Sequence, residues 1–226
     1  MTVRRTPHLV GIAGASGSGK TTLAHAVARS LGDAAVVSLD AYYRDLGHLD
    51  QAARERWNFD SPEAVDWDRC VADLRALRRG KTVQRPIYDF TTHSRQPEEE
   101  PVEPRRFLIV EGLLVLYHPE VRALLDTTIF LAVDDQTALD RRIARDRRER
   151  GRDPAAVRAQ FTRDVQPMFE RYVRPTARWA TLTLSGIDPV ETSVGRLSAH
   201  LAATQHRSLR PPSWTAMPHV ASSRTR

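Results

Sequence analysis

Short runs of apolar, often β-branched residues alternate along this chain with stretches in which apolar residues recur every three or four positions. Runs of the first kind are typical of buried strands and cover residues 8–13, 34–39, 107–110 and 128–133. Stretches of the second kind predict amphipathic helices, and the clearest cover residues 21–31, 67–79 and 136–150. Because strand and helix alternate, we predict an α/β fold with a mainly parallel sheet and helices on both faces.

Two internal segments and the C-terminal end depart from this alternation. Residues 40–66 are polar and aromatic with weak periodicity. Residues 81–104 carry prolines and the acidic run Glu98–Glu100, which we expect to form a solvated turn. Residues 205–226 hold prolines, serines and basic side chains without a periodic apolar face, so they are predicted to form a disordered basic tail.

The composition fits one domain of ordinary size. We place this domain at residues 8–204, after a flexible N-terminus over residues 1–7. No apolar run in the chain approaches the ~20 residues of a membrane helix, so we expect no membrane partner and no secretory signal. Because Cys70 is the only cysteine, an internal disulfide is impossible, and the reducing cytoplasm is the expected location.

The positive charge of the chain lies at its two ends. The formal net charge is +6 and the isoelectric point is near 10.1, values that by themselves suggest a nucleic-acid partner. Arginines in regions without acidic residues account for this surplus: Arg4, Arg5, Arg207, Arg210, Arg224 and Arg226. The predicted folded body is therefore close to neutral, and we expect no nucleic-acid partner.

One stretch between a predicted strand and a predicted helix carries a phosphate-binding signature. It has the form G-x-x-x-x-G-K-S/T and consists of Gly14, Ala15, Ser16, Gly17, Ser18, Gly19, Lys20 and Thr21. The glycines let backbone N–H groups turn toward phosphate oxygens, while the helix presents its positive end to the same anion. Lys20 is predicted to bridge the β- and γ-phosphates, and the Thr21 hydroxyl to ligate Mg²⁺. The signature predicts the P-loop NTPase fold.

The lysines narrow the class of P-loop protein. A guanine-reading N-K-x-D motif needs a lysine after an asparagine, but the only lysine besides Lys20 is Lys81, which follows Gly80. An ordinary GTPase is therefore disfavoured. A kinase requires in addition an acceptor and a group that directs the acceptor's hydroxyl at the γ-phosphate.

Two carboxylates follow predicted strands, at the edge where ligands bind in parallel sheets. Asp40 closes the strand VVSLD, where it can take the proton of an attacking alcohol or can instead cap the segment that follows. Glu111 ends the strand FLIVE, where it can hold the water shell of Mg²⁺ or can be a polar strand end. Both positions suit phosphoryl transfer.

Residues 140–153 are rich in arginine. Arginines occupy positions 141, 142, 145, 147, 148, 150 and 152, among four acidic residues. One interpretation is a solvated helix with ion pairs between residues four apart. The other is an arginine-rich lid helix that closes over a triphosphate and neutralises its charge.

Several longer stretches carry a family resemblance. They are GASGSGKTT from Gly14, SLDAYYR from Ser38, NFDSPEAVDWD from Asn58, PIYDFTTHSR from Pro86, IVEGLLVLY from Ile109, RRIARDRRERGRD from Arg141 and VRPTARWA from Val173. In this order the chain resembles the uridine kinase family of P-loop kinases, related to phosphoribulokinase. The resemblance implies transfer of the γ-phosphoryl group of ATP or GTP to the 5′-hydroxyl of uridine and of cytidine, with Mg²⁺ as cofactor.

The resemblance also implies roles at the donor end of the site. Catalysis is expected from Asp40 as the base, with Lys20 and Arg145. The metal is expected at Thr21, Glu111 and Asp40. Residues expected to bind the donor are the loop from Gly14 to Thr21, Thr22, Arg142, Arg145 and Arg152, whereas Arg141, Arg147 and Arg148 are expected to face solvent.

At the acceptor end, the resemblance implies a nucleoside. Asp60 is expected to grip the ribose hydroxyls, since two adjacent donors suit one bidentate carboxylate. Further residues expected at the nucleoside are Phe59, Tyr88, Phe90 and His93 around the base, Arg150 near the ribose, and Gln160. Without the resemblance, His93 reads as a histidine of a surface turn.

Alternatives remain open at this point. The same chemistry can serve another small alcohol, such as ribulose phosphate, pantothenate or nicotinamide riboside. A protein of another class can bind ATP without turnover and meet an acidic partner through its basic ends. The stretch GIDPVETSVGRL lacks the pattern that many relatives show near the adenine, which leaves ATP and GTP both open as donor. The family often forms tetramers, so we expect a homo-oligomer.

Overall fold

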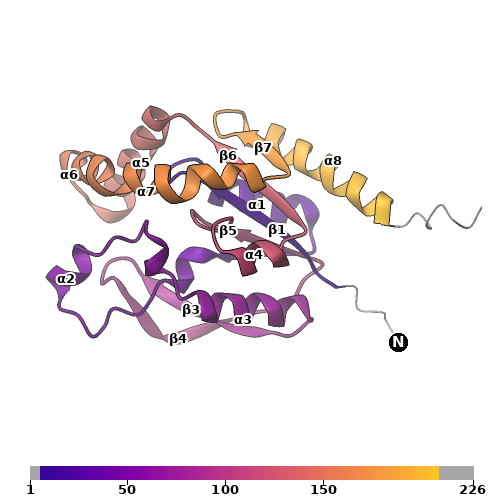
Figure 1. Cartoon of the computed structure of the whole chain (residues 1–226), viewed down its shortest axis with the longest axis horizontal. Coiled ribbons are helices and arrows are strands. Elements are labelled where there is room, and N and C mark those ends of the chain that lie inside the picture. The colour runs from indigo at the N-terminus through magenta and orange to yellow at the C-terminus, as the bar shows by residue number, and fades with distance from the viewer. Residues whose placement is uncertain (1–5, 209–226) are drawn as a thin grey trace, which may run out of the picture.

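A parallel sheet of five strands forms the centre of the protein (Figure 1). The computed structural model describes residues 6–208, with side chains described to residue 204. In the sheet the strand order is β2–β5–β1–β6–β7. Its strands are β1 (His8–Gly14), β2 (Ala34–Ser38), β5 (Phe107–Glu111), β6 (Thr127–Ala132) and β7 (Leu182–Ser185), and a separate antiparallel hairpin consists of β3 (Val83–Asp89) and β4 (Ser94–Val102).

Helical segments connect these strands. The α-helices are α1 (Lys20–Leu31), α2 (Gln51–Glu55), α3 (Trp67–Arg78), α4 (Pro119–Leu124), α5 (Asp135–Arg150), α6 (Pro154–Gln160), α7 (Gln166–Met168) and α8 (Val190–Ser208). Shorter 3₁₀ and π-helical segments are η1 (Leu39–Tyr42), η2 (Pro62–Ala64), η3 (Phe161–Val165), η4 (Phe169–Val173) and η5 (Arg174–Trp179). Each strand and helix given a range by the sequence is present, with ends displaced by one residue at most. Within residues 6–208, no helix combines the length and apolarity needed to cross a membrane.

Both faces of the sheet are buried, because successive residues of a strand point to opposite sides. In β1, Leu9 packs in the cluster that also contains Leu74 of α3. The next residue, Val10, packs in the other cluster, with Leu23 of α1 and Leu197 of α8. Helices therefore cover both faces, which confirms the predicted α/β fold.

The carboxyl ends of β2, β5 and β1 lie side by side at one edge of the sheet. Glu111, at the end of β5, pairs with Ile12 of β1 on one side and with Ser38 of β2 on the other. The loop over residues 15–19 follows β1, and η1 follows β2. This topology brings the predicted phosphate loop, Glu111 and Asp40 to the edge where ligands bind in parallel sheets.

Asp40 lies in η1 and does not close β2, which ends two residues earlier at Ser38. The prediction that Asp40 ends the strand was therefore wrong. The chain turns at this point because Leu39 and Tyr42 bury their side chains in the core. Ser38 is the residue at the N-cap of η1, so Asp40 does not serve as that cap. Its carboxylate is left for other contacts.

The predicted solvated turn at Glu98–Glu100 is instead part of β4. The acidic side chains belong to ion pairs that the local sequence does not reveal. Glu99 lies 3.1 Å from a guanidinium nitrogen of Arg69 on α3, and Glu100 pairs with Arg85 of β3. Charged side chains of this kind are common on strands at the edge of a sheet.

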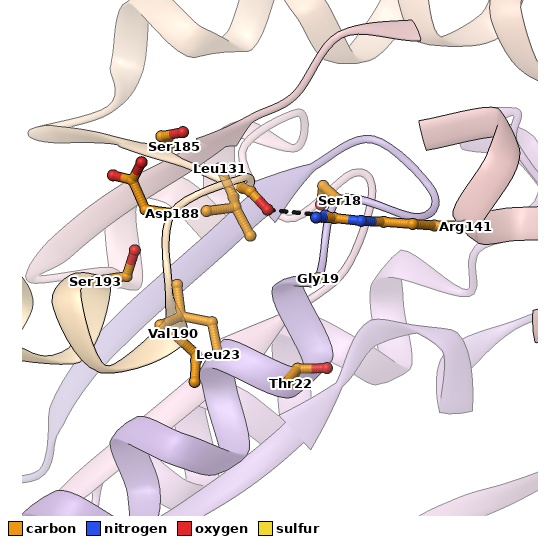
Figure 2. Close-up of a pocket in the computed structure, with 11 residues that line it drawn as sticks. Ser18, Gly19, Thr22, Leu23, Leu131, Arg141, Ser185, Asp188, Val190 and Ser193 are labelled. Carbon is orange, nitrogen blue, oxygen red and sulfur yellow. Dashed lines mark hydrogen bonds between the residues drawn. The ribbon is translucent and has the colours of Figure 1, made fainter. Parts of the chain in front are cut away.

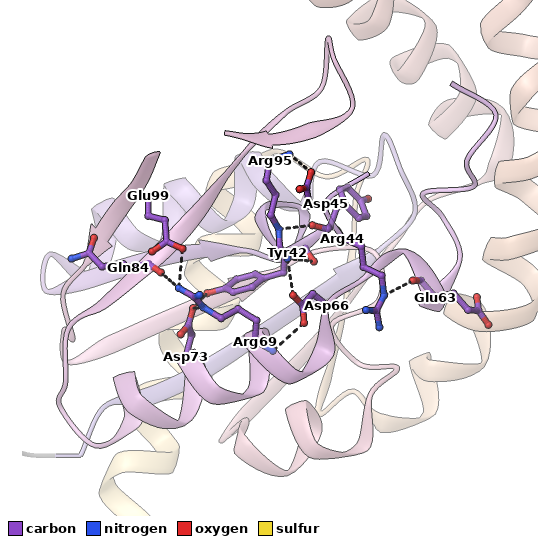
Figure 3. A network of polar contacts seen from close by, with 11 residues as sticks. Tyr42, Arg44, Asp45, Glu63, Asp66, Arg69, Asp73, Gln84, Arg95 and Glu99 are labelled. Carbon is purple, nitrogen blue, oxygen red and sulfur yellow. Dashed lines mark hydrogen bonds and ion pairs between the residues drawn. The ribbon is translucent and has the colours of Figure 1, made fainter. Parts of the chain in front are cut away.

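A polar network ties the hairpin to α3 and η1 (Figure 3). The Tyr42 hydroxyl donates to Asp73 at 3.2 Å, and Asp73 also accepts from Nε of Arg69 at 3.1 Å. Arg95 of β4 donates to the carbonyl of Tyr43 at 2.8 Å and to Asp66 at 3.0 Å. These bonds hold the backbone on the C-terminal side of Asp40 against the hairpin.

The last helix is longer than expected. α8 runs to Ser208, four residues past the predicted domain end at residue 204, so residues 205–208 do not belong to an irregular tail. Leu197 and Leu201, one turn apart, pack this helix in the core cluster on one face of the sheet. The predicted disorder of residues 209–226 and flexibility of residues 1–5 lie outside the described residues.

Candidate active site

The phosphate loop joins β1 to α1, as its sequence context predicts. Gly19 is the N-cap of α1, with a left-handed φ of 93°. The Lys20 ammonium bends back over the loop and donates to the carbonyl of Ala15 at 3.4 Å. Because α1 begins at Lys20, the unpaired N–H groups and the positive end of this helix lie at the phosphate loop, beside the Lys20 ammonium. The geometry suits an anion.

Gly17 fixes the loop against the start of α5. Its φ is 85°, and a Cβ placed on it would lie 2.3 Å from the carbonyl oxygen of Ala138. Gly19 has a similar backbone conformation, but nothing lies within 4 Å of a Cβ placed there. The contact with α5 is therefore specific to Gly17.

Gly17→Ala is expected to destabilise the protein more than Gly32→Ala does. Gly32 ends α1 with a φ of 75° and has nothing within 4 Å of a Cβ. Both variants carry the left-handed cost of about 1–2 kcal/mol. The clash with Ala138 adds about 1 kcal/mol or more for Gly17→Ala alone. Urea denaturation measures the difference, and equal losses would contradict close packing of the loop on α5.

The loop is also linked to α5 through Arg142. This arginine is 6% exposed, and it donates to the Ser16 hydroxyl at 2.9 Å and to the Gln160 side-chain oxygen at 3.4 Å. The arginine-rich segment is thus a helix that contacts the phosphate loop, and its role as a lid stays a prediction. In Figure 1, α5, α6 and α7 lie together in the upper part of the view, and the hairpin and α3 lie in the lower part.

Two predicted metal ligands contact each other. The Thr21 hydroxyl donates to a Glu111 carboxylate oxygen at 3.1 Å. Glu111 is 2% exposed, and burial raises the pKa of its carboxyl, an effect that the Lys20 ammonium opposes. Residues 6–208 contain no group of three or more His, Cys, Asp or Glu side chains arranged to hold a metal. A hydroxyl and one carboxylate instead suit Mg²⁺, which keeps several waters and binds substrate phosphates.

One cleft brings most predicted site residues together. The cleft lies between α5 and α6 on one side and η1, the residues after α2 and the hairpin on the other. Predicted residues that line it are Ser16, Lys20, Thr21, Asp40, Phe59, Asp60, Tyr88, Phe90, His93, Arg142, Arg145, Arg150, Arg152 and Gln160. Glu111 and Thr22 line an adjoining cavity that also contains Lys20 and Asp40.

Aromatic side chains form the wall of the cleft away from the loop. Phe59 stacks on His93, with ring centroids 4.9 Å apart and planes 17° apart. Phe59 also meets Tyr88 edge to face at 6.1 Å, and Tyr88 meets Phe90 at 5.4 Å. The four predicted base-binding residues therefore form one cluster, although they come from two separate segments.

Tyr43 belongs to this cluster, and the sequence analysis missed it. Its ring lies 5.2 Å from Phe59 and 5.3 Å from Tyr88. Its hydroxyl donates to Asp40 at 3.4 Å, and burial raises the pKa of the phenol well above its ordinary value, so the proton stays on Tyr43. The adjacent aromatic pair in LDAYYR was the available signal, but the pair alone does not tell which ring enters the core and which enters the cleft.

Two buried polar atoms in the cluster have no partner among the described residues: the hydroxyl oxygen of Tyr88 and Nδ1 of His93. His93 has a left-handed φ of 51° at the tip of the hairpin. Burial, aided by the charge of Arg150, lowers the pKa of His93, which favours a neutral imidazole. Since buried polar groups are normally paired, these atoms point to a polar ligand in the cleft.

Asp60 carries an electrostatic cost. Burial raises the pKa of its carboxyl; Arg142 opposes this shift, and the charge of Asp40 adds to it. Its backbone N–H bonds to the Asn58 side chain at 3.0 Å, which fixes the turn that presents it to the cleft. A carboxylate held at such a cost is typical of a functional position.

The structure separates the arginines of α5 and of the turn after it. Arg145, Arg150 and Arg152 line the cleft, and Arg150 lies over the ring of Phe90, 5.0 Å from its centroid. Arg147 and Arg148 are exposed, as expected. The common partner of the inward-facing arginines is Asp146, which the sequence analysis did not single out.

Arg141 does more than face solvent, which corrects its prediction. Its guanidinium donates to the carbonyl of Gly186 at 2.8 Å, across the mouth of a second cavity (Figure 2). The cavity lies on the other side of the phosphate loop, and its further lining residues are Ser18, Gly19, Thr22, Leu23, Leu131, Ser185, Asp188, Val190 and Ser193. The loop after β7 faces α5 here, a contact that spacing along the chain does not indicate.

A phosphate loop on a parallel sheet, an arginine-rich helix against that loop and a cleft beside it are features of the P-loop kinases. This class of phosphotransferase contains many families, and comparison with known proteins shows to which of them the chain belongs. The chain belongs to the Phosphoribulokinase / Uridine kinase family, whose sequence pattern matches residues 9–193.

Relatives with known names are similar over most of their length. The uridine kinase of Chloroflexus aurantiacus is 39% identical over 204 residues, which is 88% of this chain and 98% of that protein. The uridine kinase of Brevibacillus brevis is 38% identical over 200 residues, which is 84% of this chain and 94% of that protein. Both similarities cover most of this chain and are therefore not confined to the phosphate loop.

Solved structures share the fold at lower identity. Phosphoribulokinase from Rhodobacter spheroides has a TM-score of 0.60 and 16% identity, over 80% of this chain and 70% of that chain. D-glycerate 3-kinase from Cryptococcus neoformans has a TM-score of 0.58 and 19% identity, over 80% of this chain and 85% of that chain. These likenesses confirm the P-loop kinase fold.

Proposed function

We propose that this protein transfers the γ-phosphoryl group of ATP or GTP to the 5′-hydroxyl of uridine and of cytidine, giving UMP or CMP. Family membership and the uridine kinases among its relatives support a nucleoside kinase. The observation that carries the proposal is the cleft itself. It contains Lys20 of the phosphate loop, the Asp40 carboxylate and the aromatic cluster, so a donor and a nucleoside can meet at Asp40.

Neutral hydrogen-bonding groups beside aromatic rings favour a nucleoside base over a charged acceptor. Tyr88 and His93 each have a buried polar atom without a partner among the described residues, and the edge of a pyrimidine offers groups to pair with both. Phe59 and Phe90 give the base apolar surface. A ribose then extends toward Asp60, whose two oxygens can accept from adjacent hydroxyls.

The reaction requires little covalent help from the protein. The 5′-oxygen attacks the γ-phosphorus, the bond from that phosphorus to the β,γ-bridging oxygen breaks, and the alcohol proton passes to Asp40 late in the step. Lys20 and the backbone of the loop hold the β- and γ-phosphates, and Arg145 and Arg152 neutralise charge on the transferring group. Positioning and charge neutralisation supply most of the rate.

The residues present fit a bound Mg²⁺. The Thr21 hydroxyl can ligate the ion directly, whereas Glu111 and Asp40 can hold its waters. When bound, Mg²⁺ neutralises phosphate charge and orients the triphosphate. The hydrogen bond from Thr21 to the buried Glu111 holds these oxygens close together.

The donor base fits the second cavity. Leu23, Leu131 and Val190 supply apolar contacts, and Ser185 and Ser193 supply hydroxyls. Apolar walls with a few polar groups are typical of sites for a purine ring. These groups can serve adenine or guanine, so the proposal includes both ATP and GTP.

An acceptor panel tests the proposal. Release of ADP from ATP, or of GDP from GTP, is measured with Mg²⁺ and one acceptor at a time: uridine, cytidine, adenosine, ribulose 5-phosphate, pantothenate or nicotinamide riboside. We expect uridine and cytidine to give kcat/KM values about 100-fold or more above the others, since unpaired site groups reject the wrong acceptor. 5′-Deoxyuridine, which lacks the acceptor hydroxyl, is expected to inhibit without turnover.

Two results would overturn it. A clear preference for another alcohol would assign the site to a different kinase substrate. ATP binding without release of ADP for any acceptor would favour a non-catalytic ATP-binding protein that meets a partner through its basic ends. The cytoplasmic location and a homo-oligomer stay predictions and belong to the same proposal.

Asp60→Asn is expected to stabilise the folded protein at pH 7 and to weaken the binding of uridine. The native pKa of Asp60 lies above its unfolded value, so the wild type loses stability as pH rises through that native pKa. Asparagine removes the charge, so the variant gains stability relative to the wild type at pH 7, and the gain shrinks as pH falls toward about 4. Each kcal/mol gained raises Tm by roughly 2–4 °C.

The same variant is expected to bind uridine more weakly. Its KM for uridine is expected to rise by about 10-fold or more, because a charged hydrogen-bond acceptor is lost.

Thermal unfolding at pH 7 and pH 5, together with steady-state kinetics, measures both effects. Asp33→Asn is the matched control, because Asp33 is exposed and directly precedes β2, at the end of that strand opposite to Asp40. It is expected to change neither quantity. A lower Tm for Asp60→Asn at pH 7, or an unchanged KM for uridine, would contradict the role given to Asp60.

A further inference from the structure

A fully buried carboxylate lies among the lid arginines. Asp146, on α5, is 0% exposed. Its oxygens lie 2.7 Å from Arg145, 3.2 Å from Arg152, and 3.9 Å from both Arg142 and Arg150. Without an anion between them, these guanidinium groups would repel one another. Asp146 is the protein's own anion at this position.

The hydrogen bonds are directional. Arg145 uses Nε at 2.9 Å and Nη2 at 2.7 Å on the same Asp146 oxygen, which leaves its Nη1 group out of this contact. Arg152 gives Nη1 to the other oxygen of Asp146 at 3.2 Å and Nη2 to Gln160 at 2.9 Å. One edge of each guanidinium is therefore anchored. Both residues line the cleft, so their remaining guanidinium N–H groups can donate hydrogen bonds to a ligand there.

The backbone of Asp146 has a separate role. Its carbonyl accepts from the N–H groups of Gly151 and Arg152, which close the end of α5. These bonds do not involve the side chain, so the turn that carries Arg152 is held even when the carboxylate is altered. A change from carboxylate to amide therefore tests the orientation of the arginines with little effect on the path of the chain.

We propose that Asp146 is a positioning residue for the donor: its carboxylate holds Arg145 and Arg152 in the orientation in which they meet the triphosphate. This inference rests on the proposed function, because it takes the cleft as the phosphoryl-transfer site. Gln160 assists as the second acceptor for Arg152 and links it to Arg142, and through Arg142 to Ser16 of the phosphate loop. The sequence-based role of Gln160 in binding nucleoside is a separate prediction.

If the ion pairs of Asp146 had only a structural role, its replacement would have different consequences from those of a positioning residue. It would change the stability of the lid and leave the affinity for nucleotide intact in the folded protein. Burial alone would push the pKa of Asp146 up, but the arginines, Arg145 first, hold it below its ordinary value. The carboxylate is thus charged in the pH range of an assay, and replacing it removes a charge as well as bond directions.

The test compares Asp146→Asn with Asp140→Asn. Asp140 lies on the same helix, is exposed and accepts from Gln136 at 2.9 Å, so the control removes a charge from α5 without touching the arginines. Dissociation constants for ATP and for uridine are measured by calorimetry on folded protein, checked by circular dichroism. We expect Asp146→Asn to weaken ATP binding by about 10-fold or more and uridine binding by less than about 3-fold. Asp140→Asn is expected to change neither by more than about 2-fold.

Kinetics complete the test. KM for ATP is expected to rise and kcat to fall in Asp146→Asn, with KM for uridine nearly unchanged, because the arginines act on the donor and on the transferring group. Unchanged ATP affinity in a folded Asp146→Asn protein would overturn the proposal. An equal loss of ATP and uridine binding would overturn it as well, since it would indicate general loosening of the site.

A second variant covers the case in which Asp146→Asn does not fold. Arg152→Lys keeps the positive charge but cannot bridge Asp146 and Gln160 with one planar group. We expect it to weaken ATP binding by about 5-fold or more, and unchanged affinity would overturn the proposal. ATP binding does not depend on which alcohol is the acceptor, so failure of the acceptor panel and failure of this inference are distinguishable.

Discussion

Asp40→Asn is expected to lower kcat by about 10²–10⁴-fold, the range typical of losing a general base. Asparagine has nearly the same shape, and it can still accept the hydrogen bond that Tyr43 donates at 3.4 Å. It cannot take the proton of the attacking alcohol. The dissociation constant of ATP is expected to stay within about 2-fold, because the phosphates are held by the loop and the lid arginines. Single-turnover kinetics with uridine, alongside calorimetry of ATP binding, measure both quantities.

The control for this experiment is again Asp33→Asn, a carboxylate beside the opposite end of β2. Its turnover is expected to match that of the wild type. If Asp40→Asn kept comparable turnover, Asp40 would have no role as base. If it lost ATP binding instead, the carboxylate would serve mainly the metal and the donor.

Lys20→Ala is expected to impair both binding and chemistry. The ammonium lies over the loop, 3.4 Å from the carbonyl of Ala15, where the β- and γ-phosphates are expected. The positive charge of Lys20 stabilises the bound triphosphate, and it stabilises the transferring γ-phosphoryl group more strongly. We expect KM for ATP to rise and kcat to fall, each by on the order of 10²-fold or more. The protein is expected to fold normally, because Lys20 fills no part of the apolar core.

The chain provides a matched control, since Lys81 is its only other lysine. Lys81 is exposed, and it follows α3 just before the hairpin, away from the loop. Lys81→Ala is expected to leave KM for ATP and kcat within about 2-fold of the wild type. An unchanged KM for ATP in Lys20→Ala would contradict the assignment of the phosphate loop.

Much of the fold could be read from the sequence because its signals are local. The strands at residues 8–14 and 107–111 are short apolar runs, and α1 begins where the glycine-rich loop ends. In a parallel sheet the loops that follow neighbouring strands meet at one edge, so the sequence alone predicts that Asp40 and Glu111 lie near Lys20. Asp40 lies two residues past its strand, yet at the predicted edge.

The hairpin could not be predicted in the same way, because its stabilising partners are far away in sequence. Glu99 and Glu100 look like part of a solvated turn until Arg69 and Arg85 are brought beside them. The prolines of this segment also hide its strands, although a proline is tolerated at the edge of a sheet. Secondary structure here follows from tertiary contacts.

The site shows the same limit. Motifs and the family resemblance singled out Asp60, Tyr88 and His93, which lie in segments of distinctive sequence and line the cleft. They did not identify Tyr43 or Asp146, since each looks ordinary in its local context. An aspartate within a run of arginines reads as charge compensation, and only its complete burial and its hydrogen bonds reveal that it orients its neighbours.

A structure of the protein with uridine and a non-hydrolysable ATP analogue tests the central claim most directly. The quantity to measure is the distance from the Asp40 carboxylate to the 5′-oxygen of the nucleoside. We expect about 2.6–3.2 Å, with that oxygen in line with the γ-phosphorus and the bridging oxygen beyond it. A carboxylate turned away from the acceptor, farther than one water can bridge, would contradict the account.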